Sequence, residues 1–489
     1  MQARRDTPLA MRRLSGLDAG FLYMETPTLL MHTLKVAILE PPSGSRLPFE
    51  AMLEEIERRL PLLPGFRQRV LEVPFGFHHP VWVDDPAFDL RRHVHHLVLP
   101  APGTRRQLDE AIAALAGVPL DREHPLWQLY VIEGLEDDRL AVLVKIHHAM
   151  ADGAAASALL ANVMSFDDGS VDEAGGGRAE PAGALWHPAP LPGPGCLVRD
   201  ALVDHLRQLA GFPKLLLRTL TNALALIRHR LRSEVRAPMP VLSTPRTSFN
   251  TALTPNRSFA TARLPLADAR AVKTAFGVTL NDVVLAVVSG ALRAYLIERG
   301  ELPRRSLVAG VPVGTDAGGE DRLGGNRVSN LFTSLATDEP DPVRRLLTIH
   351  RVTAEAKTMQ ALIGPETFGS WVQYTPPRPY SWVVRLYSGW RLAELHPPPI
   401  NLVVSNVRGP SRPLRTAGAR LLEIYSVGPV LEGVGLNVTV WSYLDGLHVG
   451  ALACRESLPD PHLITEAMPG ALEELLASAR QRPVVRSGD

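Results

Sequence analysis

Residues 145–153, Lys145-Ile146-His147-His148-Ala149-Met150-Ala151-Asp152-Gly153, are the stretch that decides the fold. They follow an apolar, β-branched run at 140–144, which predicts a buried strand, and precede the Ala- and Leu-rich segment 154–164, which predicts a helix. We therefore expect the histidine pair where the strand ends. Asp152 and Gly153 would form the turn, because Asp caps exposed N–H groups and Gly tolerates unusual backbone conformations.

The histidine pair suits proton transfer from a hydroxyl group. An imidazole with an ordinary pKa of about 6.5 accepts such a proton near neutral pH. We predict that His148 is the general base, with His147 beside it and Asp152 hydrogen bonding to it or holding the turn rigid. The sequence has no Gly-x-Ser-x-Gly elbow or cysteine beside the pair, which favours direct transfer without a covalent enzyme intermediate. The alternative is two strand-end histidines satisfied by backbone hydrogen bonds.

The pattern His-His-x-x-x-Asp-Gly at 147–153 is the signature of the chloramphenicol-acetyltransferase-like acyltransferases. Further segments resemble one branch of them, the bacterial wax ester synthase/diacylglycerol acyltransferase family. In chain order these segments are 14–25, Pro125-Leu126-Trp127, Asn281-Asp282, 405–410 and 435–439. The resemblance covers nearly the whole chain.

This resemblance implies an α/β (α+β) fold with two chloramphenicol-acetyltransferase-like domains. Each domain would be a mixed sheet with helices, and an active-site tunnel would lie at their interface. We expect the first domain at 1–166, a flexible linker with basic amphipathic helices at 167–257, and the second domain at 258–489. The hydrophobic patterns agree, since strand and helix signals alternate in both halves. Among them, strands are expected at 33–39 and 127–133, and one closing helix is expected at 461–480.

The resemblance also implies a function. We expect an acyl-CoA-dependent O-acyltransferase that makes triacylglycerol from diacylglycerol, with wax ester synthesis from long-chain alcohols as a second activity. Acyl-CoA would be a substrate, and no cofactor is expected. One alternative is a condensation-type or polyketide-associated enzyme with a carrier-bound donor. Another is a catalytically silent protein that binds lipid droplets, which the intact histidine pair disfavours.

Other motif residues have two interpretations each. Asn281 is a candidate oxyanion donor or a helix cap, with Asp282 beside it. Pro125-Leu126-Trp127 would line a substrate channel or belong to the core. Glu25 is expected to support the site.

One segment departs from the family pattern. Relatives carry an arginine in a Pro-Val-x-x-Arg segment, and this arginine can pair with the aspartate of the signature. Here the corresponding residues 311–316 end in Asp316, which cannot act as a cation. Arg322, Arg327 or Arg67 are candidate substitutes, or Asp152 is held by its turn alone.

Composition limits the partners. The chain has 489 residues, with 52 Lys and Arg against 51 Asp and Glu, so no overall field favours nucleic acid. Cys196 and Cys454 are far apart, and no cysteine or carboxylate completes a ligand set for the cluster His93, His95 and His96, so no metal is expected. The sequence does not predict the oligomeric state.

The segment 198–235 has leucines at helical spacing, interrupted at Gly211-Phe212-Pro213, and its basic residues outnumber its acidic ones. This pattern suits helices lying on an anionic membrane or lipid droplet, but equally a crossover helix packed on its own protein. The N-terminus lacks the apolar region of a secretory signal, and no run reaches the ~20 apolar residues of a membrane span. We therefore expect a cytoplasmic protein, peripheral on the inner face of the membrane or on droplets.

Overall fold

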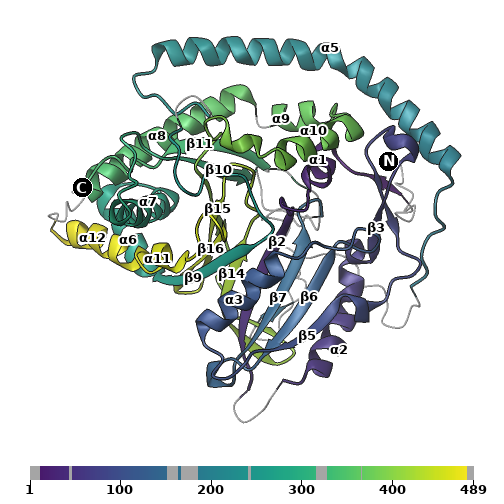
Figure 1. Cartoon of the computed structure of the whole chain (residues 1–489), viewed down its shortest axis with the longest axis horizontal. Coiled ribbons are helices and arrows are strands. Elements are labelled where there is room, and N and C mark those ends of the chain that lie inside the picture. Colours follow the sequence, from purple (N-terminus) through teal and green to yellow (C-terminus); the bar gives the residue numbers. More distant parts are fainter. Residues whose placement is uncertain are drawn as a thin grey trace, which may run out of the picture.

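The computed structural model describes residues 11–42, 47–150, 164–166, 186–240, 244–314, 326, 328–364 and 366–481. Two large sheets stand side by side in it, each with helices against it (Figure 1). The first has the strand order β5-β6-β7-β2-β14-β13-β8. Its strands are β2 (His32–Glu40), β5 (Val94–Val98), β6 (Trp127–Glu133), β7 (Leu140–His147), β8 (Ser165–Phe166), β13 (Leu414–Thr416) and β14 (Ala419–Val427).

The second sheet has the strand order β11-β10-β12-β15-β16-β9. Its strands are β9 (Arg257–Pro265), β10 (Val308–Gly314), β11 (Val328–Ser334), β12 (Leu402–Arg408), β15 (Leu436–Tyr443) and β16 (Gly446–Cys454). A small third sheet contains β1 (Arg12–Arg13), β4 (Val81–Asp84) and β3 (Gln68–Leu71). These mixed sheets with flanking helices confirm the predicted fold class.

The helices divide between the two halves. The first half has α1 (Gly16–Met24), α2 (Phe49–Arg59) and α3 (Arg105–Ala116). The second half has α6 (Leu266–Phe276), α7 (Leu280–Glu298), α8 (Pro342–Ile363), α9 (Thr367–Val372), α10 (Pro377–Gly389), α11 (His462–Thr465) and α12 (Met468–Arg480). Short 3₁₀ turns are η1 (Leu60–Leu62), η2 (Pro64–Arg67), η3 (Pro74–Gly76), η4 (Leu90–Arg92), η5 (Glu136–Asp138) and η6 (Leu392–Glu394).

The first sheet contains strands from both ends of the chain. β2 pairs antiparallel with β7, with His32 opposite His147, and on its other edge with β14. β14 and β13 come from the second half of the sequence, yet they extend the first sheet and pair with β8. The two halves are therefore joined by a continuous hydrogen-bonded ladder.

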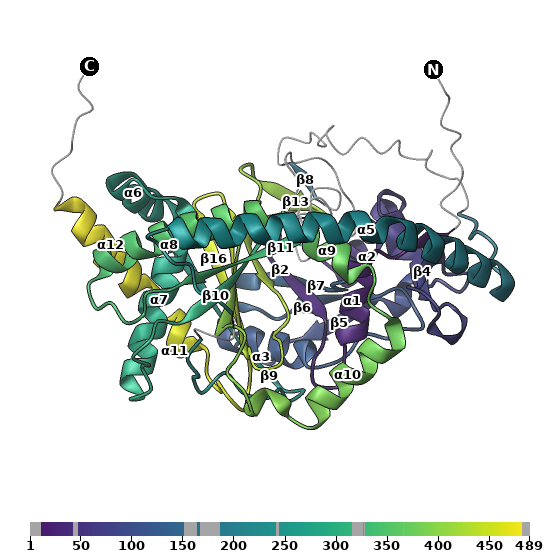
Figure 2. The same cartoon turned by 90° about the horizontal axis from the view of Figure 1, so that it is seen from above.

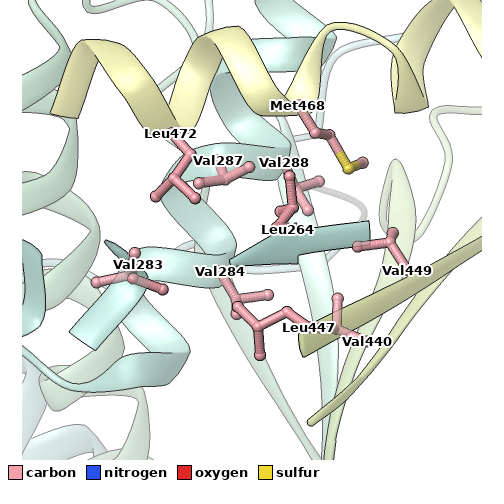
Figure 3. Close-up of a pocket in the computed structure, with 11 residues that line it drawn as sticks. Leu264, Val283, Val284, Val287, Val288, Val440, Leu447, Val449, Met468 and Leu472 are labelled. Atoms are coloured by element: carbon pink, nitrogen blue, oxygen red, sulfur yellow. The ribbon is translucent and has the colours of Figure 1, made fainter. Parts of the chain in front are cut away.

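The core of the second half is closely packed around the apolar side chains of α7. Valines of α7 meet Met468 and Leu472 of α12 and the apolar side chains of β9, β15 and β16 (Figure 3). The void among them is about 10 Å³, which is far too small for a lipid. Of the described residues, only α7 forms a helix long and apolar enough to cross a membrane, and 67% of that stretch is buried in the protein.

Two expectations about helices were wrong. Residues 194–232 form one continuous helix, α5 (Pro194–Arg232), although Pro213 lies inside it. Proline removes one backbone donor and bends a helix, but an exposed turn can leave the freed carbonyl to water. The closing segment, expected as one helix at 461–480, is instead two helices, α11 and α12.

A cluster of polar side chains joins α3 of the first half to β9 and α11 of the second. Asp109 of α3 is fully buried and accepts hydrogen bonds from Thr261 of β9. His462 of α11 places Nε2 at 3.0 Å from Asp109 and Nδ1 at 2.9 Å from Asp460. The bond to Asp109 is the main cause that raises the pKa of His462, although burial opposes it.

We predict that this cluster makes stability depend on pH. Because the folded pKa of His462 lies above the unfolded value of about 6.5, its contribution is complete below that value and is lost as the pH rises through the folded pKa. His462→Ala should lower the free energy of unfolding at pH 6 by about 1.5–3 kcal/mol and by less at pH 9. Urea unfolding of both proteins at the two pH values measures this. An equal loss at both would contradict it.

Candidate active site

The histidine pair lies where β7 ends, which confirms the expected position of the pair. The His147 N–H donates to the Leu126 carbonyl at 2.9 Å, and the His148 N–H donates to the Met31 carbonyl at 2.7 Å. The entries of β6 and β2 therefore hold the backbone of the pair from both sides. Asp152, Gly153 and the helix expected at 154–164 lie outside the described residues, apart from Met164.

Asn326 fixes the protonation state of the His148 ring. His148 Nδ1 lies 3.0 Å from Asn326 Oδ1, while Asn326 Nδ2 donates to Asp18 Oδ1 at 2.7 Å and to the His148 carbonyl at 2.6 Å. A side-chain amide oxygen only accepts hydrogen bonds, so His148 Nδ1 must carry the proton. Nε2 of the neutral ring then keeps its lone pair, as a general base requires.

The surroundings of His148 favour the neutral ring. Burial lowers the pKa of His148 to about 4, although the bond to Asn326 opposes the shift. Phe21 stacks on the imidazole with the ring centroids 4.2 Å apart and the planes inclined by 21°. His148 is therefore neutral and held in one orientation at pH 7.

His147 has the opposite arrangement. It is fully buried, and the Ala149 N–H donates to its Nδ1 at 3.1 Å, so the ring proton is on Nε2. Nε2 lies 3.6 Å from Glu25 Oε1, and the carboxylate of Glu25 is also 4.0 Å from Arg122. Burial alone would raise the pKa of Glu25, but His147 and Arg122 hold it below its usual value. The contacts of the His147 ring with Ala149 and Glu25 thus hold the end of β7 in place.

Helix α1 supplies side chains to both histidines. Ser15 caps it by accepting from the Asp18 N–H at 3.1 Å. Asp18, Phe21 and Glu25, the last directly after the helix, are spaced by three and four residues and so lie along one face. They contact Asn326, His148 and His147 respectively.

Sequence reasoning named Glu25 but missed the other contacts. The spacing of an acid and an aromatic residue on one face of α1 was a signal that could have found Asp18 and Phe21. Asn326 left no such signal, because it lies 178 residues from His148 and meets it only through the fold.

The Pro125-Leu126-Trp127 segment supports the pair and lines a cavity. Leu126 supplies the carbonyl that holds His147, as described above. Trp127 is buried, donates from Nε1 to the Phe66 carbonyl at 2.8 Å and stacks on His93. Its ring also forms part of a cavity wall. Trp127 is therefore a buried core residue that also borders a cavity, and its role in a substrate channel stays a prediction.

The cavity lies between α2 and one face of the first sheet. Its volume is about 100 Å³, and most of its lining is apolar. Val142, Val144 and Ile146 of β7 face it, and in a strand every second residue lies on the same face. His148 follows in the same alternation, just past the strand end. The apolar cavity thus runs along the strand that leads to the candidate base.

The Asn281-Asp282 motif lies at the start of α7, in the second half. Asp282 accepts from the Thr279 N–H at 2.9 Å and pairs with His350 of α8 at 2.7 Å, which makes it a helix-capping residue. No described hydrogen bond connects Asn281 with His148. Its role as oxyanion donor stays a prediction.

The other candidate residues have ordinary structural contacts. The guanidinium of Arg67 lies 5.1 Å from the ring centroid of Trp186, whereas Arg322, Arg327 and Asp316 are not among the described residues. His96 lies 3.2 Å from Glu133, and His95 packs on Tyr130. Within the described ranges, no group of three His, Cys, Asp or Glu residues could hold a metal.

Comparisons with known proteins identify relatives that match nearly the whole chain. The sequence profile of the wax ester synthase/diacylglycerol acyltransferase catalytic domain matches residues 14–284, and the profile of the family's C-terminal domain matches 324–476. A Mycobacterium tuberculosis (strain H37Rv) protein named "putative diacyglycerol O-acyltransferase" is 40% identical over 459 residues, or 94% of each chain. Another from that strain, named as a probable enzyme of the same kind, is 34% identical over 97% of this chain and 98% of its own.

Solved structures show the same relationship. The wax ester synthase/diacylglycerol acyltransferase from Marinobacter aquaeolei VT8 superposes with a TM-score of 0.66 at 27% identity, covering 96% of this chain and 100% of that one. The first condensation domain of the calcium-dependent antibiotic synthetase has a TM-score of 0.58 at 15% identity, covering 97% of each chain, and shares the fold. The resemblance inferred from the motifs is confirmed.

We predict that Asn326→Ala lowers kcat on the order of 100-fold with little change in KM, because His148 loses the partner that fixes its tautomer. Initial rates over a range of acyl-donor concentrations measure both constants. Asn330→Ala is the matched control, since Asn330 is an exposed residue of β11. An unchanged kcat in Asn326→Ala would show that the ring needs no such partner.

Proposed function

Because the chain belongs to the wax ester synthase/diacylglycerol acyltransferase family, we propose that it is an acyl-CoA-dependent diacylglycerol O-acyltransferase that makes triacylglycerol. Wax ester formation from long-chain alcohols is its second activity. The observation that carries the proposal is the neutral His148 with Nδ1–H bound to Asn326 and Nε2 unprotonated. A base in this state accepts a hydroxyl proton directly.

The reaction proceeds in one transfer. His148 Nε2 takes the proton of the acceptor hydroxyl, and the oxygen attacks the carbonyl carbon of the acyl-CoA thioester. The tetrahedral intermediate collapses by breaking the C–S bond, and the imidazolium returns its proton to the leaving thiolate. The products are an ester and free coenzyme A. Asp18 and Asn326 hold the ring in place throughout.

We expect His148→Ala to remove on the order of 1,000-fold or more of the activity, because the base is lost. The assay combines labelled palmitoyl-CoA with dioleoylglycerol or hexadecanol and separates the labelled esters. His124→Ala is the control, since His124 is a partly exposed histidine that pairs with Asp121. A fully active His148→Ala would refute the base. Lipid binding without turnover by the native chain would instead indicate a silent lipid binder.

We further propose that the cavity under α2 takes the end of a fatty chain of a substrate. It is apolar, it is bounded by Trp127 and Trp441, and its β7 wall leads to His148. An alkyl chain gains about 0.8 kcal/mol for each CH₂ buried in such a site. The cavity would therefore set the preferred chain length.

Filling the cavity should shift that preference. We predict that Val144→Phe lowers kcat/KM for palmitoyl-CoA on the order of 10-fold while that for octanoyl-CoA changes little, because the longer chain loses its space. Val98→Phe, at an exposed position of β5, is the control. The same chain-length profile in both variants would place the fatty chain elsewhere.

A further inference from the structure

Helix α5 is attached to the protein by its polar face. Its 39 residues cross the surface over both halves of the molecule (Figures 1 and 2). Asp204 pairs with Arg13 at 2.7 Å, and Asn222 donates to the Ile363 carbonyl at 2.7 Å. His229 pairs with Glu355 of α8 at 2.8 Å. Only Leu197, Ala201 and Leu215 of the helix are buried.

The apolar face of α5 points away from the protein. We call this face the leucine stripe; it consists of Leu202, Leu206, Leu209, Leu216, Leu217, Leu220, Leu224, Ile227 and Leu231, which are between 41% and 82% exposed. At 3.6 residues per turn, the stripe lies about half a turn from the residues that bind the protein. A surface helix ordinarily has the reverse arrangement, with apolar residues inward.

The leucine stripe is too long to be incidental. It runs from residue 202 to residue 231, or about 44 Å at 1.5 Å per residue. Continuous exposed apolar surfaces of this size mark sites of association, whereas single exposed leucines do not. Within the part of the chain that the structure describes, no side chain covers these leucines.

Charge identifies the partner. The helix has seven arginines and lysines against two aspartates, while the whole chain has a net charge of only +1. Arg207, Lys214, Arg228 and Arg232 are exposed and lie along one flank of the stripe at helical spacing. Each basic side chain near an anionic lipid surface contributes about 1 kcal/mol. A second copy of α5 would instead bring like charges together.

We propose that the leucine stripe of α5 docks this protein on an anionic phospholipid surface, with the helix lying in the plane of the interface. The leucines enter the boundary between headgroups and acyl chains, and the flanking basic residues pair with lipid phosphates. Because α5 crosses both halves, docking by this face fixes the orientation of the whole molecule on the lipid.

Vesicle flotation tests the apolar part of this proposal. The full chain should bind vesicles of phosphatidylcholine with 30% phosphatidylglycerol on the order of 10-fold more tightly than vesicles of phosphatidylcholine alone. The stripe variant is Leu206→Ser, Leu209→Ser, Leu217→Ser and Leu220→Ser, and it should lose on the order of 100-fold in affinity for the anionic vesicles. The control is Val98→Ser, Ile297→Ser, Leu395→Ser and Leu463→Ser, which changes equally exposed residues elsewhere and should bind as the native chain does.

A second variant tests the charge. Arg207→Gln, Lys214→Gln and Arg228→Gln together should reduce the preference for anionic vesicles to about that for neutral ones. Activity on a short-chain, water-soluble alcohol should stay native-like in every variant, which shows that the fold is intact. Native-like vesicle binding by the stripe variant would overturn the proposal. So would a native dimer that the stripe variant converts to monomer, because the stripe would then be an interface between copies.

Discussion

The hydrogen bond between His148 and Asn326 connects the chemistry of the site to the assembly of the two halves. His148 directly follows β7 of the first sheet, and Asn326 precedes β11 of the second sheet. Asp18 of α1 accepts from both the backbone N–H and the side chain of Asn326. The base therefore acquires its tautomer only when the halves are docked, and an isolated first half would lack this contact.

Other contacts also connect the two halves of the molecule. β14 extends the first sheet, and the cluster of Asp109 and His462 connects α3 of the first half with α11 of the second. Arg105 of α3 pairs with Glu423 of β14. Such long-range contacts keep the relative position of the halves fixed, as a site composed of residues from both halves requires.

The local elements could be predicted from the sequence, whereas their partners could not. The apolar runs at 33–39 and 127–133 predicted the bounds of β2 and β6 to within one residue. A short apolar run indicates a buried strand by its own composition. The histidine pair followed from its motif. The sequence did not predict which sheet the strand at 419–427 joins, because a buried strand has the same composition in either sheet. Pro213 likewise predicted a break in the helix. Helix α5 is nevertheless continuous through this exposed turn.

The position of β14 also constrains the order in which the chain can fold during synthesis. β2 is complete by residue 40, and β7 by residue 147, but the second edge of β2 waits for residues 419–427. Translation at 5–20 residues per second leaves that edge without its partner for roughly tens of seconds. An unpaired, apolar strand edge invites pairing with other chains. The nascent first half therefore exposes an apolar strand edge until the second half emerges.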